Sequence, residues 1–105
     1  PSLAERVAER LRGGIRDQAA VAAGLGMSVA TLRRRLDGEG TCFRALRRHV
    51  LADAAQAMLR QGMHVAEVAD QLGFADFRSF TRAFKHWTGM TPAHFRRLSS
   101  PPAAP

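Results

Sequence analysis

Apolar residues recur along this chain every three or four positions, the spacing that places side chains on one face of an α-helix. The longest stripe of this kind falls within residues 42–61 and consists of Phe43, Leu46, Val50, Ala54, Ala57 and Met58. Segments that alternate strictly between apolar and polar residues, the pattern of a half-buried strand, do not occur in the sequence. The pattern therefore predicts an all-α fold, whose longest helix would span roughly 30 Å at about 1.5 Å per residue.

Capping residues divide this pattern into about seven helices. Ser2 followed by Glu5 is typical of a capping box, and Thr91 before Pro92 is typical of a helix start. The predicted helices cover residues 3–12, 18–24, 29–37, 42–61, 65–72, 77–88 and 92–97. Residues 99–105 contain only Pro, Ser and Ala, which can bury little surface, so we expect a disordered tail there.

The sequence also contains an internal repeat. Residues 21–26 (VAAGLG) reappear 47 positions later as residues 68–73 (VADQLG). Each copy precedes a helix in which an arginine lies between two apolar residues, as Leu32-Arg34-Leu36 and, 48 positions later, as Phe80-Arg82-Phe84. A small residue where two helices cross and a glycine in the turn between them are typical of a helix-turn-helix unit.

The repeat predicts two homeodomain-like helix-turn-helix subdomains, residues 1–40 and 63–98, joined by a long linker helix within residues 41–62 and followed by the tail 99–105. The alternative is a helical bundle that repeats its hairpins without binding DNA. Charge favours the first interpretation, because 16 Lys and Arg against 9 Asp and Glu give a net charge of +7. All of these cations except Lys85 are arginines, which suit phosphates and guanine edges, although solubility alone would also account for a positive charge.

Helical geometry assigns an inward and an outward face to the two predicted recognition helices, residues 29–37 and 77–88. Phe77 falls on the inward stripe of the second helix together with Phe80, Phe84 and Trp87. The outward positions that we expect to read DNA bases are Ala30, Arg33 and Arg34 in the first helix and Arg78, Ser79 and Arg82 in the second. The residues expected to contact phosphates are Arg35, Lys85, Arg96 and Arg97. The linker length predicts recognition helices about one DNA turn apart, ~34 Å, in successive major-groove segments.

Other classes of function find little support in the sequence. The four histidines have no metal-ligand spacing and no catalytic constellation is visible, so we predict no metal, no cofactor and no enzyme activity. The single cysteine, Cys42, excludes an internal disulfide and fits a reducing compartment; it is either a small residue in the first turn of a helix or a redox-sensitive thiol. A single-stranded RNA reader would expose aromatic platforms, whereas these aromatic residues lie mainly on inward stripes. No apolar run is long enough for a membrane span, and we expect a cytoplasmic protein that associates with the nucleoid when bound.

Residues 73–97 closely resemble the signature of the AraC/XylS family of bacterial transcription regulators. The matching elements are Gly73-Phe74, Phe80-x-Arg82-x-Phe84-Lys85, Gly89-x-Thr91-Pro92 and Phe95-Arg96. The first half agrees more weakly, in Ser28, Leu32, Arg34, Leu36, Gly40 and Phe43, so that the resemblance covers about residues 4–98.

The resemblance implies a seven-helix, sequence-specific binder of double-stranded DNA that regulates transcription, with activation as the expected direction and RNA polymerase as a further partner. It places Ala30, Arg33, Arg34, Phe77, Arg78, Ser79 and Arg82 at or near the bases. Phe77 therefore has two interpretations, packing in the core or at the helix end, or stacking on a DNA sugar or a base methyl group. Ala30 is smaller than the residue of many members, which implies weak readout or a thymine methyl contact. A small-molecule effector would act only through an N-terminal domain, and these residues contain nothing like it.

Overall fold

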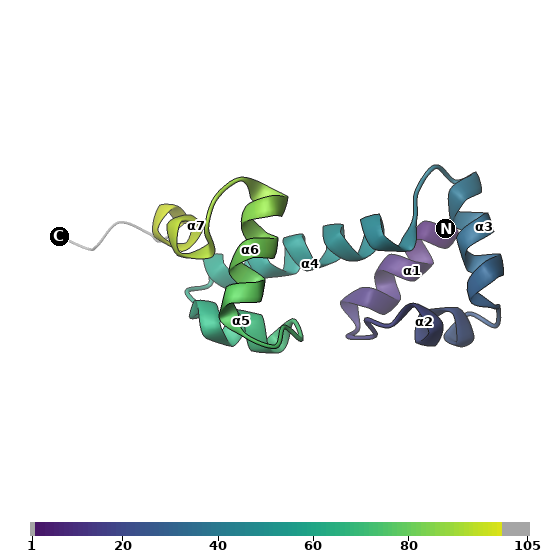
Figure 1. Cartoon of the computed structure of the whole chain (residues 1–105), viewed down its shortest axis with the longest axis horizontal. Helices are drawn as coiled ribbons and strands as arrows, with labels where there is room; N and C mark the ends of the chain where they lie inside the picture. The colour runs from purple at the N-terminus through teal and green to yellow at the C-terminus, as the bar shows by residue number, and fades with distance from the viewer. Residues whose placement is uncertain (1, 100–105) are drawn as a thin grey trace. The chain divides into compact units, whose positions relative to one another are not determined.

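The computed structural model, which describes residues 2–99, contains seven α-helices and no strand within that range (Figure 1). The helices are α1 (Leu3–Arg12), α2 (Gln18–Gly24), α3 (Val29–Gly38), α4 (Phe43–Arg60), α5 (Val65–Gln71), α6 (Phe77–Thr88) and α7 (Pro92–Ser99). The all-α prediction is confirmed, and each helix agrees with its predicted range to within two residues. The tail predicted for residues 99–105 begins one residue too early, since Ser99 ends α7; its other residues lie outside the described part of the chain.

Side-chain caps explain where several of these helices begin. The Ser2 hydroxyl accepts a hydrogen bond from the backbone amide of Glu5 at 3.1 Å, which satisfies an amide that the first turn of α1 leaves unpaired. Asp17 caps α2 and Ser28 caps α3 in the same manner, through the amides of Ala20 and Thr31. The local sequence is thus sufficient to define these boundaries.

The chain forms two compact units that divide after Leu51, within α4. The N-terminal unit contains α1, α2, α3 and the first half of α4, and the C-terminal unit contains the remainder. Val50 packs into the core of the first unit, whereas Ala55 and Leu59 are buried in the part of α4 that belongs to the second. The linker helix therefore contributes side chains to both units instead of standing apart from them.

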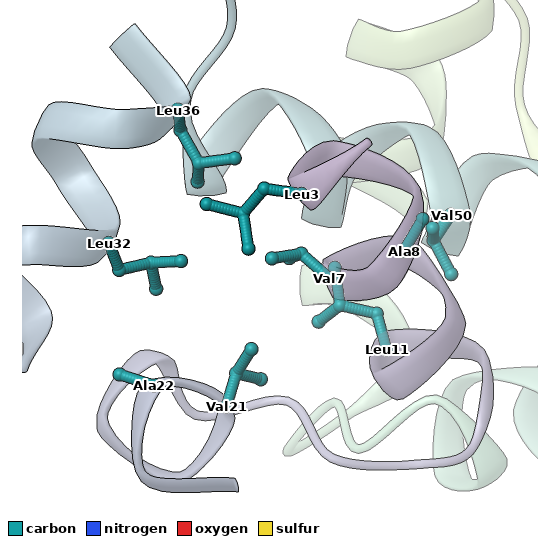
Figure 2. Packing of buried hydrophobic residues seen from close by; sticks show 9 residues of the cluster. All are labelled: Leu3, Val7, Ala8, Leu11, Val21, Ala22, Leu32, Leu36 and Val50. Atoms are coloured by element: carbon teal, nitrogen blue, oxygen red, sulfur yellow. The ribbon is translucent and has the colours of Figure 1, made fainter. Parts of the chain in front are cut away.

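The core of the N-terminal unit is aliphatic. Figure 2 shows side chains of α1, α2 and α3 converging on one region, with Val50 of α4 against α1. The buried members are Leu3, Val7, Ala8, Leu11, Val21, Ala22, Leu32, Leu36 and Val50. Ala22 is the small residue predicted at the helix crossing, and Leu32 and Leu36 are the inward residues predicted for the first recognition helix. Their burial fixes which face of α3 remains outside.

The core of the C-terminal unit combines buried aliphatic side chains, Leu59, Val68 and Leu72 among them, with a cluster of aromatic rings. The ring of Phe80 lies 5.4 Å from that of Phe74 and 5.7 Å from that of Phe84, measured between centroids. Phe84 also meets Phe95 of α7 edge to face at 5.5 Å, and Phe74 meets the half-buried Trp87 at 6.1 Å. Tilted and edge-to-face pairs at such distances add to the stabilisation that burial itself provides. These contacts hold α6 against the α5–α6 turn and α7.

The two turns of the repeat have matching geometry. Gly26 adopts a φ of +73° and Gly73 a φ of +84°, a region that residues with a side chain rarely adopt. Just after these glycines, the amide of Met27 donates to the carbonyl of Ala22 at 3.0 Å, and the amide of Phe74 donates to that of Ala69 at 2.9 Å. The predicted repeat of two helix-turn-helix units is therefore present in the backbone as well as in the sequence.

Candidate nucleic-acid interface

The outer face of α3 is basic. Arg33, Arg34 and Arg35 are exposed, as is Ala30 in the first turn. The first turn is held by Ser28, whose hydroxyl accepts from the amide of Thr31 at 3.1 Å and donates to the Thr31 hydroxyl at 3.0 Å. A fixed first turn matters because the N-terminal residues of a recognition helix are those that contact base edges.

The outer face of α6 is similarly basic, with Arg78, Arg82 and Lys85 exposed. Its first turn is held by Asp76, whose carboxylate accepts from the backbone amide of Ser79 at 2.8 Å. Hydrogen bonds from the amide and then the side chain of Ser79 lower the pKa of Asp76, and the positive charge of Arg82 adds to the effect. Asp76 therefore remains ionised near neutral pH. Ser79, half-buried and engaged with Asp76, serves the first turn whether or not it also meets a base.

Phe77 departs from the inward stripe on which the helical wheel places it. Its side chain is 54% exposed, whereas Phe80, one turn later, is fully buried. The helical wheel misplaces Phe77 because this residue is the first of α6. Along α6, the aromatic contacts of the core begin only at Phe80. The Phe77 ring lines a small hollow of about 240 Å³ together with Ala66, Asp70 and Phe74. The predicted place of Phe77 on the inward stripe is thus wrong for much of the ring, whose exposed part forms an apolar surface beside Arg78.

A shift of 48 residues superimposes the two recognition helices in sequence, and the caps fall in register. Ser28 corresponds to Asp76, and Thr31 to Ser79. The same shift pairs Arg34 with Arg82, both exposed, and pairs Ala30 with Arg78. The frame of the two helices is therefore shared, while the outward side chains differ at the second helical position.

An open groove of about 680 Å³ lies in the N-terminal unit beside α3. Arg33, Arg34 and Asp37 of α3 line it, together with Gln18 of α2 and with Cys42 and Arg44 at the start of α4. Sequence reasoning did not single out Gln18 or Arg44. The sequence signal that could have identified Arg44 is its position, as a cation, in the first turn of a helix predicted to begin near the end of α3.

The two arginines of α7 lie in different environments. One Nη of Arg96, a half-buried residue, donates to the carbonyl of Gly62 at 2.9 Å, so that it ties α7 to the turn after α4. Arg97 is exposed, with one Nη at 3.4 Å from Nδ1 of His94. In the same region the guanidinium of Arg60 lies 5.4 Å from the centre of the Phe95 ring. Arg96 thus has a structural role that its prediction as a phosphate contact did not include.

Two further charged residues that the sequence analysis did not single out stabilise the N-terminal unit. The carboxylate of Glu39, just after α3, accepts from the amides of Leu3 and Ala4 at 3.1 and 3.0 Å, and so caps α1 from a distant part of the chain. Arg16 donates to the carbonyl of Leu11, and burial, followed by the charge of Arg47, lowers its pKa. Glu39 thus joins the end of α3 to the start of α1, and Arg16 joins the segment before α2 to the end of α1.

Residues 2–99 bring no three His, Cys, Asp or Glu side chains together in a way that could hold a metal ion. None of the helices in this part of the chain is both long and apolar enough to cross a membrane.

A family model described as a helix-turn-helix domain matches residues 21–98 of the chain. The chain is 42% identical over 78 residues to an uncharacterized HTH-type transcriptional regulator of Mycobacterium tuberculosis, which covers 73% of this chain and 23% of that protein. It is 33% identical over 78 residues to the transcriptional activator NphR of a Rhodococcus species, with the same two coverages. The chain thus spans about a quarter of the length of the curated relatives it matches.

Solved structures resemble the fold closely. A DNA-binding transcriptional dual regulator from Escherichia coli K-12 superimposes with a TM-score of 0.87 at 25% identity, over 94% of this chain and 93% of that one. The transcriptional regulator CdpR from Pseudomonas aeruginosa gives a TM-score of 0.76 at 39% identity, over 85% of this chain and 29% of that one.

Proposed function

The chain belongs to the AraC/XylS family of helix-turn-helix transcription regulators, whose members bind DNA, and from this premise we propose that it recognises a specific double-stranded sequence through both of its helix-turn-helix units. In this proposal α3 and α6 enter successive major-groove segments, and binding activates transcription. The relative from a Rhodococcus species is named a transcriptional activator, which supports this direction.

The observation that carries the proposal is the pair Arg34 and Arg82. Each is exposed on a capped helix. The opposite face of that helix is buried and consists of Leu32 and Leu36 in α3, and of Phe80 and Phe84 in α6. An arginine so presented can bond guanine O6 and N7 with two parallel hydrogen bonds, worth about 1–3 kcal/mol of discrimination against another base.

The other proposed base contacts follow from chemistry. Arg33 and Arg78 supply further guanidinium donors beside Arg34 and Arg82. Ala30 and the exposed part of Phe77 offer apolar surface to a thymine methyl group, and Ser79 offers a hydroxyl. The first unit, with the small Ala30 where the second has Arg78, would recognise a different sequence from the second.

Phosphate contacts would set the register of the domain on the duplex. We assign them to Arg35, Lys85 and Arg97, which are exposed, and to Arg96, which is half-buried and also bonds the Gly62 carbonyl. RNA polymerase is the proposed partner in activation. Because the curated relatives are about four times as long as the matched region, we place effector binding in a separate, N-terminal domain. DNA as the partner implies a cytoplasmic, nucleoid-associated location.

The decisive experiment selects bound duplexes from a random DNA pool at near-physiological salt. We expect a motif of two boxes about ten base pairs apart. Arg34→Ala should relax the preference at one position of one box and Arg82→Ala at one position of the other, by about 1–3 kcal/mol each, while Arg6→Ala, an exposed residue of α1, changes neither. Uniform weakening over all sequences would show that these arginines only contact phosphates. Recovery of no motif would refute sequence-specific recognition.

A further inference from the structure

We propose that the groove beside α3 holds the sugar-phosphate backbone of one DNA strand and that Arg44, at the start of α4, contacts a phosphate there. This inference rests on the proposed DNA binding and assigns to it a residue outside both the base-reading and the phosphate set named above. The groove is lined by Gln18, Arg33, Arg34, Asp37, Cys42 and Arg44, and by the smaller or apolar Ala30, Thr41 and Phe43.

Charge selects the occupant. Three arginines line the groove against one acidic residue, Asp37, and all four of these side chains are exposed. A groove lined by cations concentrates an anionic polymer, because the charges act together near a low-dielectric wall. Gln18, the first residue of α2, adds a neutral amide that can donate to a phosphate or sugar oxygen.

The position of α4 adds to this potential. The helix has 18 residues and begins at Phe43, directly after Cys42, which lines the groove. The first amides of an α-helix have no partner within the helix, and its N-terminus carries a partial positive charge. Arg44 lies in that first turn, so that its guanidinium and the helix dipole favour the same anionic ligand.

The groove is continuous with the proposed base-reading surface. Arg33 and Arg34 form part of its lining and also belong to the outer face of α3. A helix that lies in the major groove has a phosphate backbone along each side, since the two strands bound that groove. With Arg33 and Arg34 on base edges, the strand beside α3 would pass along Arg44. Arg44 would then fix the register of the N-terminal unit, which has Ala30 where the other unit has Arg78.

The first test compares Arg44→Gln with the matched control Arg6→Gln, which removes one positive charge from the same unit outside the groove. The duplexes are one of about three helical turns with random sequence and, if selection recovers a motif, one that carries it. We expect Arg44→Gln to weaken both by roughly three- to tenfold at about 0.1 M salt and to reduce the slope of log K against log salt by about one. Circular dichroism verifies that both variants fold.

The second test uses Cys42, the single cysteine of the chain, which is exposed in the groove. Saturating duplex should slow alkylation of its thiol by iodoacetamide several-fold. A negatively charged adduct, formed at Cys42 with a methanethiosulfonate reagent, should weaken DNA binding more than a positively charged adduct of similar size. Only the negatively charged adduct repels a phosphate.

The outcomes separate this inference from the proposed function. If a selected motif is bound but Arg44→Gln behaves like Arg6→Gln, or if bound DNA leaves the alkylation rate of Cys42 unchanged, the groove does not hold the strand and sequence recognition stands without it. If DNA binds without any sequence preference yet protects Cys42, the groove assignment holds and sequence-specific regulation fails. If no duplex binds, both are overturned.

Discussion

Phe77 and Phe80 lie three positions apart in α6, and the helical wheel gives them the same role. The structure does not, since Phe77 is 54% exposed and Phe80 is fully buried against Phe74 and Phe84. Replacing each phenylalanine with alanine should therefore produce very different losses of stability. The comparison is well matched because the helix, the residue type and the substitution are the same.

The expected magnitudes follow from burial. Removing the ring of Phe80 leaves a cavity among aromatic side chains and should cost about 3–5 kcal/mol. A fully buried phenylalanine gains about 1.5–3 kcal/mol from leaving water, so the roughly half-buried Phe77 gains about 1 kcal/mol. Alanine is a better helix former by about 0.5 kcal/mol at both positions, which offsets part of each loss. The free energies of unfolding of the two variants should thus differ by at least about 2 kcal/mol.

Thermal unfolding followed by circular dichroism measures this difference. For a domain of this size, 1 kcal/mol shifts Tm by about 4–8 °C, so Phe77→Ala should unfold within a few degrees of the unchanged chain. Phe80→Ala should unfold far lower, and Phe80→Leu provides a milder change if the alanine variant does not fold. Equal losses at the two positions would refute the described placement of Phe77. Because Phe77→Ala should remain folded, any loss of preference for thymine in its selected motif would report contact with DNA.

Two further predictions concern Arg96 and Asp76. Arg96→Ala should lower the free energy of unfolding by about 1–2 kcal/mol in denaturant titrations, because the Gly62 carbonyl loses a charged donor. Arg97→Ala should change the free energy of unfolding by less than about 0.5 kcal/mol and should instead reduce the salt slope of DNA binding. The reverse pattern would refute the structural role of Arg96. Because folding lowers the pKa of Asp76, its ionisation stabilises the fold above the unfolded-state pKa of about 3.9, and this contribution is lost as pH falls through the lower folded-state pKa. Asp76→Asn retains a capping side chain and should flatten this part of the stability profile below about pH 4; an unchanged profile would exclude Asp76 as its source.

The helices and the caps supplied by neighbouring side chains could be predicted because they depend on residues close together in the chain. Ser2, Asp17, Ser28 and Asp76 each cap a helix through an amide three positions later, so the relevant information lies within one turn. The glycine turns of the repeat are equally local. The buried face of α3 could also be predicted, because Leu32 and Leu36 lie in the core, where other side chains of the N-terminal unit surround them.

The candidate site was predictable only in part. The exposure of Arg33, Arg34, Arg78 and Arg82 follows from helical periodicity, because the opposite faces are strongly apolar. Periodicity gives the face of a helix on which a residue lies, but not how far the packed neighbouring segments extend along that face. It therefore predicted burial for Phe77, which lies at the start of α6 and is largely exposed. It also could not bring Gln18 and Arg44 to the groove beside α3, since these two residues belong to α2 and α4 and only folding places them next to α3.

The sequence by itself determined the all-α class, the number of helices, the two repeated turns and the basic outer faces, because each depends on spacing within a few residues or on composition. Only the tertiary structure decided which charged groups serve the fold. Glu39 caps α1 from 35 and 36 positions away, and Arg96 reaches the Gly62 carbonyl from 34 positions away. Such contacts form only when folding brings distant segments together. The identity of a charged residue does not indicate whether its partner will be a backbone amide, a carbonyl or a phosphate.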